Sequence, residues 1–483
     1  MKLFDILKDV EYKLIQGEDK EIRTIETDSR KASDNSLFIC ISGFHVDGHK
    51  FIQNAYDKGA VAFVIEKDLE EYIPDATYIK VQNSREAWSF MAQSFYKNPS
   101  EKFRLIGITG TNGKTSSTYF LEAILKEYGR KTGIIGTIGV TAMGEPVDIK
   151  FDTSTTPDPM ELQHIFSHMA EKGIDDVIME VTSHALELHK VAGIHFDIGE
   201  FTNLTQDHLD LHGSMEAYKE AKGKLFKACD ISIINSDDAY SLYMQECTAG
   251  KIITYGIEKP ADIKAYNVKY YNNGIKFDVS INGDAVEFSI PIPGRFTVYN
   301  ALGVITCSIA MDIPIDIIKR ALENLHGVPG RIQSVPNDKG IGVYVDYSHT
   351  PDSLENIICA VREFTKGKVI TIFGCGGDRD RTKRPIMGEI SGKLSDFSII
   401  TSDNPRTEIP SQILDDIEPG VKKAEGNYIK IVDRKEAIFY GIKMAEKGDS
   451  VIIAGKGHEN YQIFADKTIH FDDWEIANEA LKD

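Results

Sequence analysis

The chain has 483 residues, and its formal net charge of −19 argues against binding nucleic acid or anionic lipid through the overall electrostatic field. At roughly 100–200 residues per domain, this length predicts about three domains, each able to bury its own core. The six cysteines form no C-x-x-C pair, and the N-terminus has no long apolar run. We therefore expect a cytoplasmic protein with reduced thiols, without a signal peptide or a spanning helix.

Residues 1–98 form the first predicted domain, a small α/β unit. Short apolar runs at 36–41 and 60–65 predict strands, and residues 84–95 predict a helix. The tripeptide Asn98-Pro99-Ser100 is typical of a linker, so a new domain is expected to begin there.

Residues 99–329 form the second predicted domain, in which strands alternate with helices. This alternation predicts a mainly parallel sheet covered on both faces. Three later runs separated by Asn-Asn-Gly and Asn-Gly-Asp predict an added antiparallel sheet built from hairpins. The predicted strands are 104–109, 176–181, 197–202, 263–271, 275–281 and 285–290, and the predicted helices are 114–128, 159–172, 298–311 and 315–325.

Residues 330–483 form the third predicted domain, which follows a linker at 327–331. Strands with helices between them again predict a doubly wound, Rossmann-like α/β unit. The predicted strands are 342–347, 369–374, 397–402, 428–432 and 450–454.

A phosphate-binding loop lies between a predicted strand and a predicted helix, in the sequence Gly-Ile-Thr-Gly-Thr-Asn-Gly-Lys-Thr at 107–115. Small residues let backbone N–H groups approach phosphate, Lys114 reaches the β and γ phosphates, and the Thr115 hydroxyl binds Mg²⁺. The usual spacing has glycine where this chain has Ile108, so the loop is a variant. Such loops occur in kinases, motor ATPases and ligases. The candidate ATP contacts here are Gly110, Thr111, Asn112, Gly113, Lys114, Thr115 and Ser116.

Two further side chains are candidate Mg²⁺ ligands. Glu180 ends an apolar strand, and His208 lies in a loop after the next strand. Ligands bind at the carboxyl ends of strands in α/β proteins, and oxygen ligands with one imidazole suit Mg²⁺ better than zinc. Either residue alone is more often structural, so the hypothesis depends on both belonging to the sheet that carries the phosphate loop.

Lys222 lies on a predicted helix with a charged face. The residues alone predict a solvated lysine there, which nothing distinguishes from Lys219 or Lys224.

Five segments of the chain match the motifs of one enzyme family in their order along the chain: 109–115, 179–186, 203–213, 294–301 and 346–352. On these segments the chain resembles the Mur ligase family over nearly its whole length. Its departures from the family motifs are small, since Thr182, Thr297 and Ser348 stand where Ser, Asn and Ala are usual.

The resemblance implies an ATP-dependent ligase of peptidoglycan precursor synthesis. A substrate carboxylate attacks the γ-phosphate of ATP, and an amine then attacks the acyl phosphate. It also implies Mg²⁺, a CO₂-derived carbamate on Lys222, a monomer, no nucleic acid and no membrane insertion. The implied catalytic residues are Lys114, Lys222, Glu180 and His208, and the implied metal ligands are Thr115, Glu180, His208 and carbamylated Lys222. The further implied ATP contacts are Asn300, Arg331, Asp346 and His349.

The first domain resembles that of the tripeptide-forming ligases, which act on UDP-N-acetylmuramoyl-L-alanyl-D-glutamate. Leu188 and Lys190 stand where those ligases often have Gln and Arg, and Leu188 cannot hydrogen-bond. The residues implied to bind this substrate are Thr27, Ser29, Phe44, His45, Val46, Thr155, Thr156, Thr182 and Lys190.

The amino acid is expected to be meso-diaminopimelate, because the Asp-Asn-Pro-Arg sequence at 403–406 resembles that of diaminopimelate-adding members. A planar guanidinium at Arg406 suits the distal carboxylate, which lysine lacks. Binding of lysine would leave that guanidinium buried and unpaired, which would weaken the binding of lysine. The resemblance implies that Glu459 pairs with an ammonium group of the amino acid. The implied contacts are Arg379, Asp403, Asn404, Pro405, Arg406, Gly455 and Glu459.

Four alternatives remain open. They are the same ligase using L-lysine, a folylpolyglutamate synthetase, a P-loop kinase or transport ATPase, and a non-catalytic sensor of UDP-muramyl peptides. Nucleotide-like turns in the first domain argue against a folylpolyglutamate synthetase. A P-loop kinase or transport ATPase does not explain the last domain. An exposed turn is the alternative for Arg406. The residues whose retention argues against a sensor are Lys114, Thr115, Glu180, His208 and Lys222.

Overall fold

The computed structural model describes residues 1–43, 46–147, 149, 155–207, 209–271, 274–281, 283–325 and 327–483. Its contacts divide the chain into two compact units: Met1–Tyr255 with Thr306–Asp312, and Gly256–Ile305 with Ile313–Asp483. The fold class predicted from the sequence is confirmed, whereas the domain boundaries at 98 and 329 stay predictions.

The first unit begins with a five-stranded sheet of order β1-β5-β4-β3-β2, in which only β1 is antiparallel to its neighbour. Alternate residues of β3 and β4 pack on opposite faces, one against α1 and α3 and the other against α2. The elements are α1 (Leu3–Ile6), β1 (Lys13–Gln16), β2 (Thr24–Glu26), β3 (Ser36–Ile39), η1 (Gly48–Phe51), α2 (Ile52–Tyr56), β4 (Ala60–Ile65), β5 (Thr77–Lys80), α3 (Ser84–Tyr96) and η2 (Pro99–Lys102).

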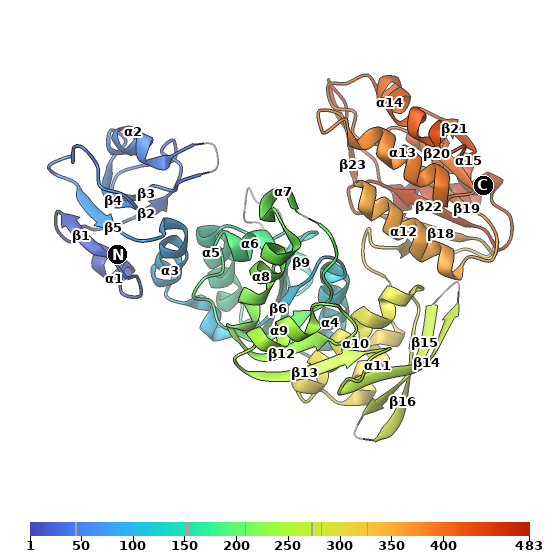
Figure 1. The fold of residues 1–483 in the computed structure, drawn as a ribbon, viewed down its shortest axis with the longest axis horizontal. Helices are drawn as coiled ribbons and strands as arrows, with labels where there is room; N and C mark the ends of the chain where they lie inside the picture. Colours follow the sequence, from blue (N-terminus) through green and yellow to red (C-terminus); the bar gives the residue numbers. More distant parts are fainter. Residues whose placement is uncertain are drawn as a thin grey trace. The chain divides into compact units, whose positions relative to one another are not determined.

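A second sheet in this unit has β6 at its centre, with β11, β12 and β13 on one side and β10, β7, β8 and β9 on the other. Figure 1 labels β6, β9, β12 and β13 of this sheet. The pairings of β6 with β10 and β11 are parallel, as the alternation of strands and helices predicted. The elements are β6 (Arg104–Thr109), α4 (Lys114–Glu127), β7 (Thr132–Gly136), β8 (Gly139–Ala142), β9 (Glu145–Pro146), α5 (Pro159–Glu171), β10 (Asp176–Glu180), α6 (Ser183–Glu187), β11 (Phe196–Phe201), α7 (Leu209–His212), α8 (Met215–Phe226), β12 (Cys229–Asn235), α9 (Ser241–Cys247) and β13 (Lys251–Gly256).

Helix α3 joins the two sheets of the first unit. The Ser89 hydroxyl donates to the carbonyl of Lys190 at 3.1 Å, and the Gln93 amide donates to the carbonyl of Ala192 at 2.8 Å. These bonds run from side chains of the helix to backbone atoms of one loop. They therefore fix the position of that loop against α3.

A buried carboxyl lies in the middle of the second sheet, on β11. Glu200 is 0% exposed, and Cys307 Sγ donates to its Oε2 at 3.8 Å. Its Oε1 makes no hydrogen bond within the described residues. Burial raises the pKa of Glu200 from its ordinary value of 4.5 to about 8.

We expect Glu200→Gln to stabilise the protein, and to do so more in alkali than in acid. Between pH 4.5 and about 8 the unfolded chain has lost a proton that the folded protein keeps, so stability falls as pH rises. Removing the carboxyl removes this penalty, which is on the order of 4 kcal/mol above about pH 8. Thermal unfolding at about pH 5 and about pH 8.5 measures the difference. The exposed Glu246→Gln is the control, and an equal stabilisation by Glu200→Gln at both pH values would contradict the expectation.

The second unit contains an antiparallel meander and a six-stranded sheet. The meander is β14-β15-β16, and the sheet has the order β17-β18-β22-β19-β20-β21 with parallel pairing except at β17. The elements are β14 (Ile263–Tyr271), β15 (Gly274–Ile281), β16 (Asp284–Ile290), α10 (Arg295–Ala310), α11 (Ile315–Glu323), β17 (Gln333–Ser334), β18 (Gly342–Asp346), α12 (Pro351–Phe364), β19 (Val369–Phe373), α13 (Lys383–Leu394), β20 (Phe397–Ile400), α14 (Pro410–Lys423), β21 (Tyr428–Lys430), α15 (Arg434–Met444), β22 (Ser450–Ala454), β23 (Tyr461–Ile463), β24 (Thr468–His470) and α16 (Asp473–Lys482).

Helices cover both faces of this six-stranded sheet (Figure 1). One core joins strand residues such as Phe373 and Ile452 to α12, α13 and α14, and the other joins Ile372 and Ile453 to α15 and α16. Successive residues of one strand enter opposite cores, as a doubly wound sheet requires. The carboxyl ends of these strands therefore lead into loops at one edge.

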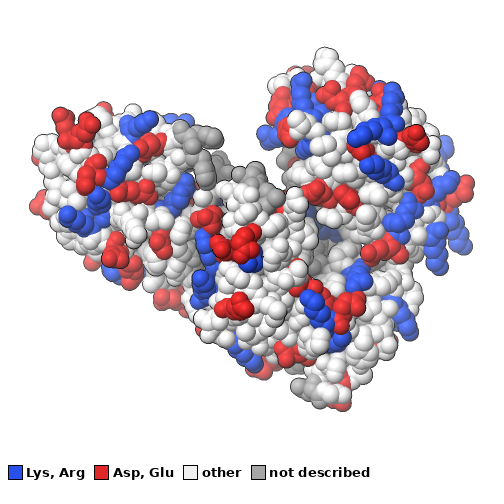
Figure 2. Space-filling model, viewed as in Figure 1, with Lys and Arg blue, Asp and Glu red and all other residues white. Residues whose placement is uncertain are grey.

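Acidic and basic side chains are interspersed on the face shown in Figure 2. None of the described helices combines the length and the apolar character needed to cross a lipid bilayer.

Candidate functional site

The phosphate loop begins where β6 ends and closes at the first turn of α4. Gly113, with φ of 88°, adopts the left-handed conformation directly before the helix. Lys114 Nζ donates to the carbonyls of Gly110 at 2.8 Å and Thr111 at 2.9 Å. The loop thus places an ammonium beside the N-terminal amides of a 14-residue helix, an arrangement suited to phosphate.

The segment after β11 holds the phosphate loop in place. The Thr202 hydroxyl donates to the carbonyl of Asn112 at 2.7 Å. The Asn203 side chain accepts from the Asn112 N–H at 2.9 Å and donates to its carbonyl at 3.1 Å. A Cβ at Gly110 would lie 1.8 Å from Thr202 Oγ1, so only glycine permits this approach. Thr202 and Asn203 were not assigned a role from the sequence.

Lys222 lies against the same loop, and its interpretation as a solvated lysine is wrong. It is 1% exposed, and its Nζ donates to the carbonyl of Gly110 at 2.8 Å. Lys114 and Lys222 therefore share one acceptor. By contrast, Lys219 pairs with Glu216 and Lys224 pairs with Glu187, so the fold distinguishes the three lysines.

Burial is the main cause that lowers the pKa of Lys222 well below its ordinary value, and the neighbouring charge of Lys114 acts in the same direction. A lowered pKa leaves more of the amine unprotonated near neutral pH. An unprotonated amine is the form that reacts with CO₂. Burial and the charge of Lys114 therefore both favour the unprotonated amine of Lys222.

Glu180 ends β10, in register with Ile108 of β6, so it lies at the edge of the sheet that carries the phosphate loop. The Thr137 N–H donates to its Oε1 at 2.9 Å, and the Thr137 hydroxyl donates to its Oε2 at 3.0 Å. Thr137 Oγ1 also lies 3.0 Å from Thr155 Oγ1. Thr137 was not singled out from the sequence, although it connects two predicted sites.

The predicted dipeptide contacts form one network with Glu180. The Thr156 hydroxyl donates to the Glu180 carbonyl at 2.9 Å and to Thr182 Oγ1 at 3.2 Å. Lys190 Nζ donates to the Thr156 carbonyl at 3.4 Å and lies 2.7 Å from Asp158 Oδ1. The carboxylate and the dipeptide contacts are therefore adjacent.

The side-chain oxygen atoms described at this edge of the sheet are suitable ligands for a hard cation. The carboxylate of Glu180 and the buried hydroxyl of Thr115 are oxygen ligands of the kind that Mg²⁺ prefers. Among the described residues no cluster of three or more His, Cys, Asp or Glu side chains can hold a metal ion. His208 lies outside the described residues, so its predicted role in metal binding stays a prediction.

Three of the predicted uridine-nucleotide contacts are described, and they lie in loops of the first sheet. Thr27 is half-buried and Ser29 is buried after β2, whereas Val46 is exposed. Phe44 and His45 lie outside the described residues.

Three of the predicted ATP contacts in the second unit gather around Tyr347. Asp346 Oδ2 accepts from the Ile332 N–H at 2.9 Å, and burial raises the pKa of Asp346. The Arg331 guanidinium lies 5.6 Å from the Tyr347 ring centroid, and the His349 ring lies 4.6 Å from it. The fourth predicted contact is Asn300, which is buried on α10.

The predicted amino-acid contacts converge at the carboxyl ends of β20 and β22. Arg406 has φ of 53°, and its Nη1 donates to the Gly377 carbonyl at 2.9 Å. Its Nε and Nη2 make no hydrogen bond within the described part of the chain, which leaves a planar fork for a carboxylate. Arg406 is partly buried, and the neighbouring Arg379 is exposed.

Loop contacts join the other members of this set. The Asn404 amide donates to Glu459 Oε2 at 2.9 Å, and a Cβ at Gly455 would lie 2.6 Å from Asp403 Oδ2. Asp403 Oδ2 is buried and makes no hydrogen bond to a described residue.

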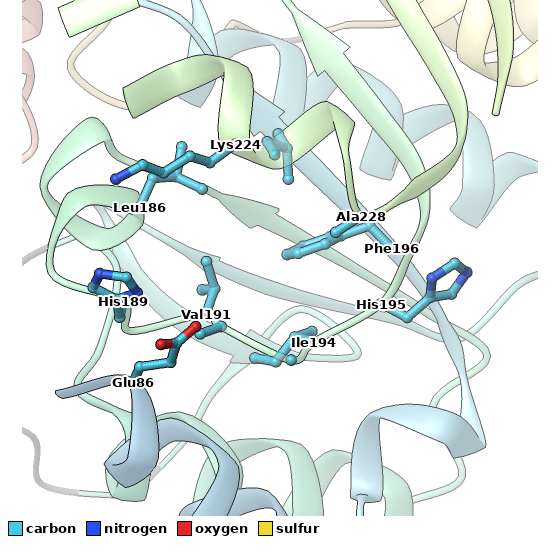
Figure 3. Close-up of a pocket in the computed structure, with 12 residues that line it drawn as sticks. Glu86, Leu186, His189, Val191, Ile194, His195, Phe196, Lys224 and Ala228 are labelled. Carbon is cyan, nitrogen blue, oxygen red and sulfur yellow. The ribbon is translucent and has the colours of Figure 1, made fainter. Parts of the chain in front are cut away.

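A pocket of about 410 Å³ lies elsewhere in the first unit (Figure 3). Its lining consists of Glu86 of α3, several of the residues between 186 and 196, and residues at the end of α8, among them Lys224. Phe196 and Ala228, at the starts of β11 and β12, place it at the amino edge of the sheet, opposite the phosphate loop. None of its lining residues is a predicted contact.

Three family models match successive parts of the chain. Residues 21–96 match the Mur ligase family catalytic domain, 108–308 the Mur ligase middle domain, and 330–457 the Mur ligase glutamate ligase domain.

Full-length relatives and solved structures show the same likeness. A UDP-N-acetylmuramoyl-L-alanyl-D-glutamate–2,6-diaminopimelate ligase from Clostridium botulinum is 47% identical over 487 residues, covering 100% of both chains. A solved structure of a ligase with that name has a TM-score of 0.70 and 30% identity, covering 96% of this chain and 95% of that one. A folylpolyglutamate synthase from Mycobacterium tuberculosis, at 14% identity and a TM-score of 0.59, shares the fold over 76% of this chain and 92% of that one.

Proposed function

Because the chain belongs to the Mur ligase family, we propose that it joins meso-diaminopimelate to UDP-N-acetylmuramoyl-L-alanyl-D-glutamate in peptidoglycan precursor synthesis. The observation that carries this proposal is the Asp-Asn-Pro-Arg turn, in which Nε and Nη2 of Arg406 have no hydrogen-bond partners among the described residues. The names of relatives that are 44–48% identical over nearly the full length agree with it.

The proposed reaction has two steps. The substrate carboxylate attacks the γ-phosphorus of ATP, which forms an acyl phosphate and releases ADP. The amine of diaminopimelate then attacks the acyl carbon, phosphate leaves with the C–O bonding pair, and the amine loses its proton. Lys114 and the N-terminus of α4 neutralise phosphate charge, and exclusion of water keeps the acyl phosphate from hydrolysis.

Mg²⁺ fits this proposal as a cofactor. Thr115 would hold one Mg²⁺, and Glu180, His208 and a carbamate on Lys222 would help to hold a second. Both ions would neutralise negative charge on the phosphates. Asn300, Arg331, Asp346 and His349 are proposed to contact ATP. The protein is proposed to act in the cytoplasm, where ATP and the UDP-linked precursor are available, and to act as a monomer.

Competition between amino acids tests the proposal. The protein is incubated with ATP, Mg²⁺, UDP-N-acetylmuramoyl-L-alanyl-D-glutamate and equal meso-diaminopimelate and L-lysine, and the product is weighed by mass spectrometry. We expect a product that contains diaminopimelate, since lysine has no second carboxylate for Arg406. A product that contains mainly lysine would refute the specificity, and absence of ATP turnover would support a sensor.

A further inference from the structure

Lys456 is a buried cation behind the predicted amino-acid contacts. It follows β22 directly after Gly455 and is 0% exposed. Its Nζ lies 3.0 Å from Glu459 Oε2 and 3.2 Å from Asn404 Oδ1. Full burial keeps Lys456 from touching a ligand, so any role that it has must act through these two partners.

The three side chains form a closed set of contacts. Besides meeting Lys456, the Asn404 amide donates to Glu459 Oε2 at 2.9 Å. Asn404 Oδ1 also accepts the N–H of Ile463 at 3.0 Å, which ties the set to β23. Since a buried ammonium must keep its acceptors, neither Asn404 nor Glu459 can rotate away without leaving the charge unpaired.

We propose that Lys456 is a positioning residue that sets the specificity of the amino-acid site. It holds Glu459 by Oε2, so the carboxylate presents Oε1 to an ammonium group of the incoming amino acid. It also fixes Asn404 and thereby the turn that carries Arg406, whose Nη1 lies 3.4 Å from the Asn404 carbonyl. This inference rests on the proposed function, because it concerns how the same amino acid is bound.

Steady-state kinetics of Lys456→Met test the inference. We expect the KM for diaminopimelate to rise at least tenfold, while the KM values for ATP and for the UDP-linked substrate change less than twofold. Lys467→Met is the matched control, because Lys467 is an exposed lysine near the same strands whose Nζ lies 5.8 Å from the Phe464 ring centroid. The control should leave every KM within twofold.

A double-mutant cycle with Glu459→Gln separates positioning from general stability. If Lys456 acts through Glu459, the double variant should bind diaminopimelate no worse than Glu459→Gln alone. The double variant also leaves no buried ion unpaired, so it tests the inference even where Lys456→Met fails to fold. Multiplicative losses in the double variant, or an unchanged KM for diaminopimelate in folded Lys456→Met, would overturn the inference. A wild-type protein that does not use diaminopimelate at all would instead refute the proposed function.

Discussion

Lys222→Ala is expected to lower the ligation rate by roughly a hundred- to a thousandfold, the cost of removing one preorganised electrostatic group. Added short carboxylates such as acetate should restore part of the rate, because they can supply the missing anionic oxygens. The carbamate is a proposal, and the burial and lowered pKa of Lys222 support it. Phosphate release with and without acetate measures both effects.

Two neighbours on the same helix serve as controls for this result. Lys219→Ala and Lys224→Ala remove lysines that pair with acidic side chains, and both variants should keep nearly full activity. Depleting CO₂ should slow the wild-type protein and leave Lys222→Ala unchanged. An active Lys222→Ala that is indifferent to CO₂ would end the carbamate hypothesis.

Arg406→Ala should raise the KM for diaminopimelate by roughly a hundredfold, the cost of removing one partner of a desolvated charge pair. ATP binding should remain near normal, because the described side-chain hydrogen bonds of Arg406 go only to the carbonyls of Gly377 and of Asn404 in its own turn. Calorimetric titration with ATP and steady-state kinetics with varied diaminopimelate measure the two quantities separately.

Arg406→Lys is the matched variant, since it keeps the charge but loses the planar fork. We expect it to recover only part of the affinity for diaminopimelate. An equal loss of ATP binding in Arg406→Ala would contradict the role proposed for this residue.

Local pattern was enough to predict most of the framework. Apolar runs bounded by turn residues predicted strands that became β6, β10 and β19, because burial on both faces of a parallel sheet demands such runs. Asn-Gly sequences predicted the meander β14-β15-β16 for a similarly local reason. The phosphate loop was also found locally, since its chemistry lies within nine consecutive residues.

Contacts between distant segments could not be predicted in this way. Lys222 looked like its neighbours because its burial depends on Gly110, which lies 112 residues away. Thr137 and Lys456 gave no signal, because a single Thr or Lys acquires its partner only when separate loops meet. The resemblance to a family assigned a role to Lys222, but it assigned none to Thr137 or Lys456.

The two hydrogen bonds from α3 to the loop of Lys190 and Ala192 hold that loop at a fixed distance from the helix. The turns proposed to grip the uridine end and the lysine proposed to meet the peptide end are braced at a set spacing. A precursor with a different distance between its uridine and peptide ends would then fit less well. Length, as well as chemistry, would then decide which precursor is extended.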